Sequence, residues 1–310
     1  MKYFSYIFVI ILIKLTMSGC IEQLCSEENK LFNAPPDTTS LLTFINSVEM
    51  KQRLKVINEP TLLKNGKKRL KGVKVIPQNG DDFRKANLDK VYWRGASVIE
   101  GDFRGARFQT ADCREGEYSY SDFRFCDVRW ADFSNSEVKN CDFSQSALFR
   151  LHINDANLEG SDFQGSNMFG VIGHRAVLRN CDFSNALLKE SEFLNADFTG
   201  SRAIKVRFII SVLQGAKLDS TDLSYSDFTG AGLEDASLIN ARLIDVTFQG
   251  AHLQSADFTG ADLKDCNFFA AEFENTVFTD AINIPDQIKD LIVDDKITGV
   301  CSEVENNNKK

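Results

Sequence analysis

A large apolar side chain stands at nearly every fifth position from Phe83 to Phe278, and no other feature constrains the fold as strongly. The series holds forty positions without a change of phase: 17 are Phe, 13 are Leu, and only Gly173 and Ala203 are small. A period of five fits neither the 3.6-residue turn of an α-helix nor the two-residue repeat of a flat strand. It fits a backbone that turns a corner every five residues and points one large side chain inward on each side.

A second series of small residues, mostly Ala, Ser, Cys, Thr, Val or Gly, precedes the first by two positions. Between the two lies a polar position that holds 14 Asp and 4 Asn. A longer period of twenty appears in the motifs Asp82-Phe83-Arg84, Asp102-Phe103-Arg104 and Asp122-Phe123-Arg124. Four sides therefore make one coil. We expect one side to stack the rings of Phe83, Phe103, Phe123, Phe143, Phe163 and Phe183.

Quintets such as Ala256-Asp257-Phe258-Thr259-Gly260 resemble the pentapeptide repeat family, whose members fold as right-handed quadrilateral β-helices. The resemblance implies an all-β solenoid of about ten coils over residues 81–280, whose two ends need covers. Residues 21–80 are then a linker and a small α/β flank, and residues 281–310 are a capping helix with a disordered tail. Ile288, Leu291 and Ile292 are expected to close the last coil. In some family members a C-terminal segment also forms a homodimer.

The first twenty residues are expected to be an export signal. Lys2 precedes an apolar run from Tyr3 to Ile13, which is too short for a transmembrane helix and has the length of a signal-peptide core. Ser18 and Gly19 lead into Cys20, which resembles the acylated cysteine of a bacterial lipoprotein. Ile21 follows that cysteine, and the resemblance then favours the outer membrane. An ordinary cleaved signal and an uncleaved anchor stay open as alternatives.

The flank before the coil contains two patterned stretches. Asp37-Thr38-Thr39-Ser40 is typical of a helix start, and the apolar positions that follow predict a helix to about Ile57. Residues 61–76 are basic and contain Asn65-Gly66, which favours a hairpin. That basic stretch is either a contact with anionic lipid or a solvated hairpin face, and we favour the solvated face.

The cysteines and histidines do not indicate a metal site, a cofactor or an enzyme. Cys113, Cys126, Cys141, Cys181 and Cys266 fall on inward positions, where cysteine acts as a small apolar residue. Cys25 and Cys301 are left as a candidate disulfide. The three histidines are expected at the surface, and His152 and His252 lie five coils apart, too far for a shared metal. Motifs for nucleotide binding, metal-dependent hydrolysis or serine catalysis are missing from the sequence.

One side of the predicted coil carries an acidic column. It comprises Asp82, Asp102, Asp122, Asp142, Asp162, Asp182, Asp222 and Asp262, interrupted by Arg202 and Arg242. Hydrogen bonds to corner amides explain such residues structurally, and Arg84, Arg104 and Arg124 are expected to neutralise the first three. The functional alternative is DNA mimicry, since some family members occupy the DNA site of gyrase. Residues 81–280 hold 32 Asp and Glu against 20 Lys and Arg, but an exported protein would not meet gyrase.

A group of apolar residues occupies positions that are expected to face outward. The candidate interaction surface comprises Phe169, Ile172, Val177, Ile204, Ile209, Ile210 and Val212, near the position where Gly173 replaces a large core residue. Clustered exposed apolar side chains are typical of a contact surface. Either a protein partner binds there, or the N-terminal helix folds back over it.

These observations predict an exported, lipid-anchored, non-catalytic scaffold that binds an unknown protein partner. Its contact with the membrane would run through Cys20, and the overall charge of −8 argues against binding nucleic acid. Two alternatives stay open, a DNA-mimic regulator of a topoisomerase and a secreted bacterial effector.

Overall fold

The computed structural model describes residues 79–80 and 82–300, with side chains described as far as Ile297. The expected signal peptide, Cys20, the flank up to residue 78, the candidate disulfide of Cys25 with Cys301, and the C-terminal tail lie outside the described residues. Within the described part of the chain, no helix is long and apolar enough to cross a membrane.

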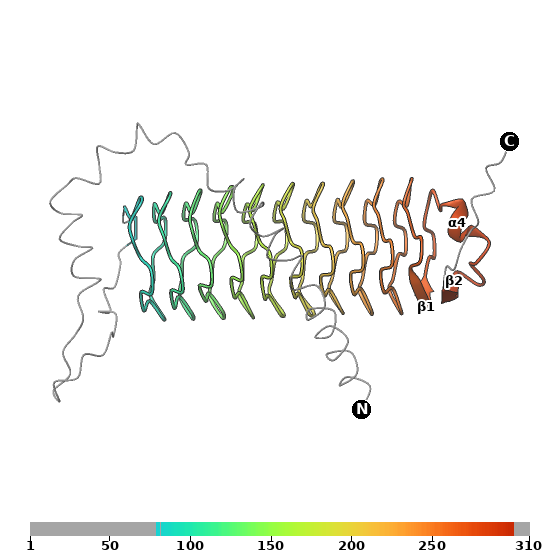
Figure 1. Ribbon diagram of the computed structural model, residues 1–310, viewed down its shortest axis with the longest axis horizontal. Helices are drawn as coiled ribbons and strands as arrows, with labels where there is room; N and C mark the ends of the chain where they lie inside the picture. The colour runs from blue at the N-terminus through green and yellow to red at the C-terminus, as the bar shows by residue number, and fades with distance from the viewer. Residues whose placement is uncertain (1–78, 81, 301–310) are drawn as a thin grey trace, which may run out of the picture. The chain divides into compact units, whose positions relative to one another are not determined.

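The described chain winds into a four-sided coil with twenty residues to each turn (Figure 1). Parallel bridges join each residue of four columns to the residue twenty positions later, beginning with Asp82↔Asp102 and ending with Asp262↔Ile282. We name the four sides by their first bridging residue: side A begins at Asp82, side B at Asn87, side C at Tyr92 and side D at Ser97. The backbone hydrogen bonds follow the same register, since the Phe83 amide donates to the Asp102 carbonyl at 2.7 Å.

Every corner of the coil has the same backbone conformation. The fifth residue of each quintet, from Lys85 to Asp280, has a positive φ near 60°, which is the left-handed region. Glycine, asparagine and aspartate adopt this region most readily, and they fill many of the corners. The turn closes by a hydrogen bond such as the one from the Ala86 amide to the Phe83 carbonyl, at 2.9 Å.

The core contains the two inward series that the sequence predicts. On side A the rings of Phe103 and Phe123 stack 4.6 Å apart, and the whole expected ladder from Phe83 to Phe183 is stacked. The small residues lie beneath the corners, where their polar atoms bond the neighbouring coil. Ser146 Oγ, for example, donates to the Phe123 carbonyl at 2.7 Å and accepts from the Cys126 amide at 3.0 Å.

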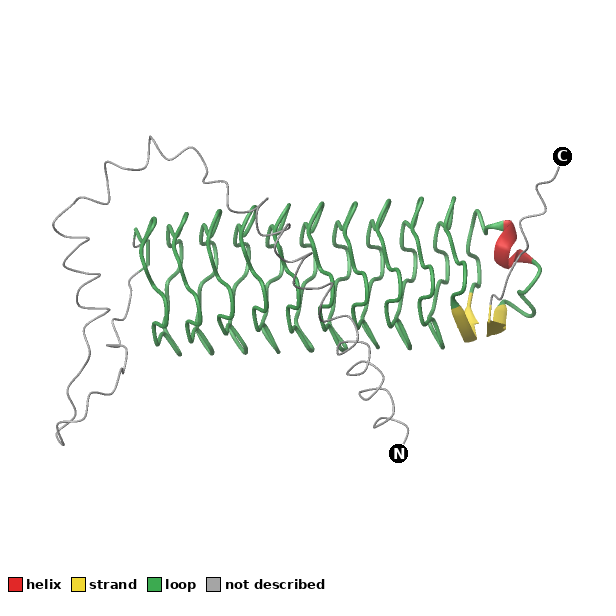
Figure 2. Ribbon diagram, viewed as in Figure 1, coloured by secondary structure: helices red, strands yellow, loops and turns green. Residues whose placement is uncertain are grey.

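A short cap follows the last coil (Figure 2). It consists of the helix α4 (Asp286–Lys289) and the strand β2 (Lys296–Val300). β2 pairs in the antiparallel sense with the strand β1 (Glu272–Val277), which belongs to the last coil. The helix is a single turn, shorter than expected, because the chain reverses through Asp294 and Asp295 to form β2. Ile288 is buried and Ile292 partly buried as anticipated, but Leu291 is exposed, and Ile297 of β2 takes its place in the core.

Candidate functional site

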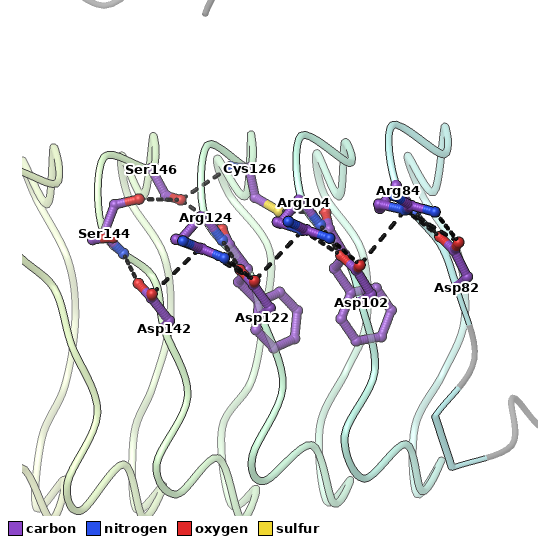
Figure 3. Close-up of polar contacts among 12 residues, drawn as sticks. Asp82, Arg84, Asp102, Arg104, Asp122, Arg124, Cys126, Asp142, Ser144 and Ser146 are labelled. Carbon is purple, nitrogen blue, oxygen red and sulfur yellow. Dashed lines mark hydrogen bonds and ion pairs between the residues drawn. The ribbon is translucent and has the colours of Figure 1, made fainter. Parts of the chain in front are cut away.

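The acidic column on side A is a ladder of alternating charges over its first half (Figure 3). The Arg104 guanidinium donates to both carboxylate oxygens of Asp102, at 2.9 and 2.6 Å, and its Nε lies 3.5 Å from Asp122 of the next coil. Arg84 bridges Asp82 and Asp102 in the same way, and Arg124 bridges Asp122 and Asp142. The sequence predicted that these three arginines neutralise the nearest aspartates; the contacts also reach the following coil.

Two aspartates of this column differ in their acidity because their neighbours differ. Burial disfavours the charged form of Asp102, but the hydrogen bonds and charges of Arg104 and the charge of Arg84 outweigh it and lower its pKa. Asp162 has Gln164 in place of an arginine, and it lies between Asp142 and Asp182. Burial and the two neighbouring carboxylates raise the pKa of Asp162.

Further along the column, arginines again neutralise aspartates. Arg202 lies 3.4 Å from Asp182, and Arg242 lies 3.1 Å from Asp222. Eight aspartates on this side are therefore accompanied by five arginines, and side A is not a continuous stripe of negative charge.

The seven apolar residues of the predicted interaction surface lie on several sides of the coil. Phe169, Ile209 and Ile210 lie on the corner between sides B and C, and Ile204 lies on the corner between sides A and B. Ile172 and Val212 lie on side C, where Glu192 separates them in the bridge column. Val177 lies on side D. Four of the seven thus border side B.

Phe169 is only 5% exposed, because its ring stacks on that of Phe149, 5.3 Å away. Trp130 packs edge-on against the other side of Phe149, at 5.4 Å. Sequence reasoning missed Trp130, Phe149 and the exposed Phe125 because corner positions carry no fixed residue type. Reading every twentieth residue as one column would have revealed them.

Side B concentrates the exposed large apolar residues of the coil. Between residues 82 and 280 the described chain exposes seven of them, and five border side B: Phe125, Trp130, Ile210, Tyr225 and Phe269. The central column of side B is buried in its middle part, at Asn167 and Leu187. The exposed large apolar residues of this side lie on its corners.

The charge of side B is opposite to that of the rest of the coil. We define the side-B surface as the ten segments 84–90, 104–110 and so on to 264–270, which are side B with its two corners. These segments hold twelve Lys and Arg against six Asp and Glu, a net charge of +6. Three of the twelve are Arg84, Arg104 and Arg124, which pair with the aspartates of side A, and without them the net charge is +3. The remaining positions of residues 81–280 hold eight against 26, a net charge of −18.

Cations also contact the aromatic rings of this surface. The Arg150 guanidinium carbon lies 5.5 Å from the Phe149 ring centre, that of Arg129 lies 5.6 Å from Trp130, and Lys205 Nζ lies 6.0 Å from Tyr225. Arg150, Lys189 and Lys205 form no ion pair with any residue that the structure describes. The side-B surface thus carries apolar and cationic groups side by side.

The reactive side chains of the described region are dispersed or buried. Burial raises the pKa of Cys141 and of Cys181 to about 12, so both thiols stay protonated and inert. His252 Nδ1 lies 2.9 Å from a carboxylate oxygen of Glu272. Burial lowers the pKa of His174, although the charge of nearby Glu192 acts in the opposite direction. Residues 79–80 and 82–300 contain no group of three His, Cys, Asp or Glu arranged to hold a metal ion.

Comparisons with known proteins find the same kind of repeat. The family model described as pentapeptide repeats matches eight copies, over residues 126–165, 174–208, 211–250, 231–269 and 248–282. Members of that family form right-handed β-helices, in keeping with the coil described above. A search of curated proteins finds no significant match.

Several solved structures of pentapeptide repeat proteins are also similar. HetL, involved in heterocyst differentiation regulation in the cyanobacterium Nostoc sp. strain PCC 7120, is 20% identical over 66% of this chain and 87% of its own, with a TM-score of 0.38. Trypsin-treated QnrB1, a plasmid-mediated fluoroquinolone resistance protein, is 16% identical over 64% and 89%, with a TM-score of 0.49. A protein of the Arabidopsis thaliana thylakoid lumen is 30% identical over 34% and 64%, with a TM-score of 0.20. Similarity at this level says nothing about what the present chain binds.

Proposed function

Because the repeat region of the chain belongs to the pentapeptide repeat family, we propose that the protein is an exported, lipid-anchored scaffold without catalytic activity of its own. Its coil is a rigid support, since every quintet is bonded to the coils before and after it. The scaffold acts by binding at its outer surfaces, and at least one of its partners is a protein.

The observation that carries this proposal is the division of the coil into two surfaces of opposite character. The side-B surface is cationic and apolar, whereas sides A, C and D are acidic. A rigid body with two such surfaces can hold two different partners in a fixed relation, which is the minimum that a scaffold requires. The proposed membrane location rests on Ser18, Gly19 and Cys20, which resemble the acylation site of a bacterial lipoprotein.

Two substitutions on the side-B surface test its role in binding. Ile209→Asp with Ile210→Asp places two charges on a corner that borders side B, and both residues are at least partly exposed. We expect the pair to abolish binding through this surface without lowering the melting temperature of the coil. The matched control is Ile239→Asp with Asn240→Asp, which changes the same two positions of the corner between sides D and A.

Affinity capture from the cell envelope and circular dichroism together provide the measurement. Loss of binding in the side-B pair alone supports the proposed surface. Unchanged capture in a folded side-B pair would show that no protein partner binds at the side-B surface and would leave that surface for a partner of another kind.

The address is tested separately by incorporation of labelled palmitate, comparing the natural chain with Cys20→Ala. We expect label in the membrane fraction, lost on substitution. An unlabelled chain in the cytosol would overturn the export and the lipid anchor, and would bring the topoisomerase alternative forward.

A further inference from the structure

We propose that the side-B surface between Phe125 and Ile210 lies against an anionic phospholipid membrane. The inference deepens the scaffold function and rests on it, because it names the partner of one of the two surfaces. The acidic side D then faces away from the lipid, sides A and C stand beside the contact, and these three sides are left for the protein partner.

The side-B surface carries a net positive charge, whereas the other sides of the coil are acidic. An anionic membrane attracts a local cationic face even when the rest of the protein is acidic, because the surface potential decays within about one Debye length. Between Phe125 and Ile210 the side-B surface carries five Lys and Arg against two Asp and Glu. The other sides, counted together with the arginines of the side-A ladder, carry a net charge of −15, which would orient the coil with side B toward the lipid.

The two corners that border side B carry exposed aromatic rings. Trp130 is 44% exposed and Phe125 is 46% exposed, and they lie on the two corners that border side B in one coil. Rings with an exposed edge beside a cation match the interfacial zone of a bilayer, where apolar and polar groups meet. Ile210, 37% exposed, extends the same edge four coils further along.

Three cations of the side-B surface are not engaged in ion pairs with the described residues. Arg150, Lys189 and Lys205 have no carboxylate partner among the described residues, unlike Arg104 and Arg124 on side A. Contact with lipid phosphates would therefore break no ion pair that these three make in the described part of the chain. Their long side chains can extend past the rings to headgroup depth.

Side B runs straight along the coil. Bridges from Asp127 through Ala147, Asn167 and Leu187 to Arg207 keep side B in one straight register. Phe125 lies on one corner of this straight side and Trp130 on the other, so a flat surface laid on side B would meet both exposed rings. A bilayer is such a surface, and the contact would extend over the coils that carry the exposed rings.

The position of the two tryptophans allows a direct test. Trp93 is 1% exposed in the core, so Trp130 is the only tryptophan that can meet lipid. The full chain with Cys20→Ala, which cannot be acylated, is mixed with brominated phosphatidylcholine vesicles that contain about 30% phosphatidylglycerol. We expect the Trp130 emission to be quenched and shifted to the blue, and we expect Trp130→Phe to remove this response.

A tryptophan on the opposite corner provides the control. Tyr120 is a corner residue of the same backbone conformation, 61% exposed, between sides D and A. In the Trp130→Phe background, Tyr120→Trp should not be quenched by the same vesicles. This control separates contact through side B from tethering by the N-terminal segment, which would bring every side near the lipid.

The charge contribution is tested by Arg150→Gln, Lys189→Gln and Lys205→Gln in one chain. A basic residue at an anionic surface contributes roughly fivefold to binding, so the triple variant should bind these vesicles roughly 100-fold more weakly. The control variant, with Arg175→Gln, Arg179→Gln and Lys217→Gln, loses three positive charges from other sides and should keep its binding.

Two outcomes would overturn the inference. The first is an unquenched Trp130, and the second is equal quenching of the tryptophan placed at residue 120. If Trp130 stays unquenched while Ile209→Asp with Ile210→Asp loses a protein partner, side B is a protein interface, and the scaffold function survives without the membrane contact.

Discussion

At the scale of single residues, Ile210 occupies a backbone conformation that suits it poorly. Its φ is 56°, in the left-handed region, where a β-branched side chain is strained. We expect Ile210→Asn to stabilise the coil by about 1 kcal/mol, because asparagine tolerates this region. A urea unfolding midpoint measures the change.

The control is Ile209→Asn, at a neighbouring position without a positive φ, which should bring no such gain. A lower midpoint for Ile210→Asn would mean that apolar contacts of Ile210 outweigh its strain. A stabilised variant that binds more weakly would indicate that the strained isoleucine is kept for its exposed surface.

Gly173 provides a second prediction at this scale. It occupies a central core position where large residues prevail, yet a Cβ there would lie 2.8 Å from the Phe193 ring and 3.1 Å from Ile153. Gly173→Leu would restore the repeat pattern, but we expect it to destabilise the coil by about 1–3 kcal/mol through overpacking. Phe193→Ala in the same chain should recover part of the loss.

Gly232→Ala serves as the comparison in the same unfolding measurement. Its Cβ would meet the flexible carboxylate of Glu234, at 3.0 Å, and the effect should be small. If Gly173→Leu unfolded like the natural chain, the rings of Phe193 and its neighbours would have to rearrange at little cost.

At the scale of the element, the side-A ladder predicts opposite effects for the same substitution. Asp102→Asn should lower stability at pH 7, because it removes a charge that Arg84 and Arg104 hold. Asp162→Asn should raise it, because Asp162 has carboxylates on both sides. Each change should be below about 1 kcal/mol, since the side chains are partly solvated.

The pH dependence gives the sign of each effect. The pKa of Asp102 is lowered in the fold, so its contribution is present above the ordinary range near pH 4 and is lost as the pH falls through the lowered pKa. The pKa of Asp162 is raised, so its cost at neutral pH disappears as the folded chain takes up a proton. Unfolding midpoints at pH 7 and pH 4 should therefore show the advantage of Asp162→Asn shrinking in acid. An advantage that grew in acid would contradict the raised pKa.

At the scale of the whole molecule, the charge pattern predicts that the protein does not mimic DNA at a topoisomerase. Negative charge on sides A, C and D is interrupted by arginines, and side B is cationic. We expect the purified chain to leave DNA supercoiling by gyrase unchanged, with and without a fluoroquinolone. Inhibition of supercoiling, or protection from the drug, would restore the topoisomerase alternative and count against the scaffold.

The coil could be predicted from the sequence because its repeat is written in the residue pattern. The five-residue period indicates which residues point inward, and the twenty-residue period indicates that one turn has four sides. The cap strand β2 could not be predicted, because Lys296–Val300 pairs with β1 some twenty residues earlier and has no repeat pattern of its own. Of the predicted apolar surface, Ile210 is exposed and Ile209 partly exposed on one corner, whereas Val177 lies on side D, away from them. Exposure at a corner depends on neighbours twenty residues away, as the stacking of Phe169 on Phe149 shows.

The twenty-residue register also sets a rule for how the chain can change its length. Removing one quintet, such as residues 141–145, would keep the inward pattern intact and leave a coil that still folds. Everything downstream would turn by a quarter revolution, however, so Ile210 would no longer share an edge with Trp130. Removing twenty residues would only shorten the coil. The coil can therefore fold after insertions or deletions of any multiple of five residues. A surface that runs along one side is preserved only by multiples of twenty, so insertions or deletions that keep binding should have such lengths.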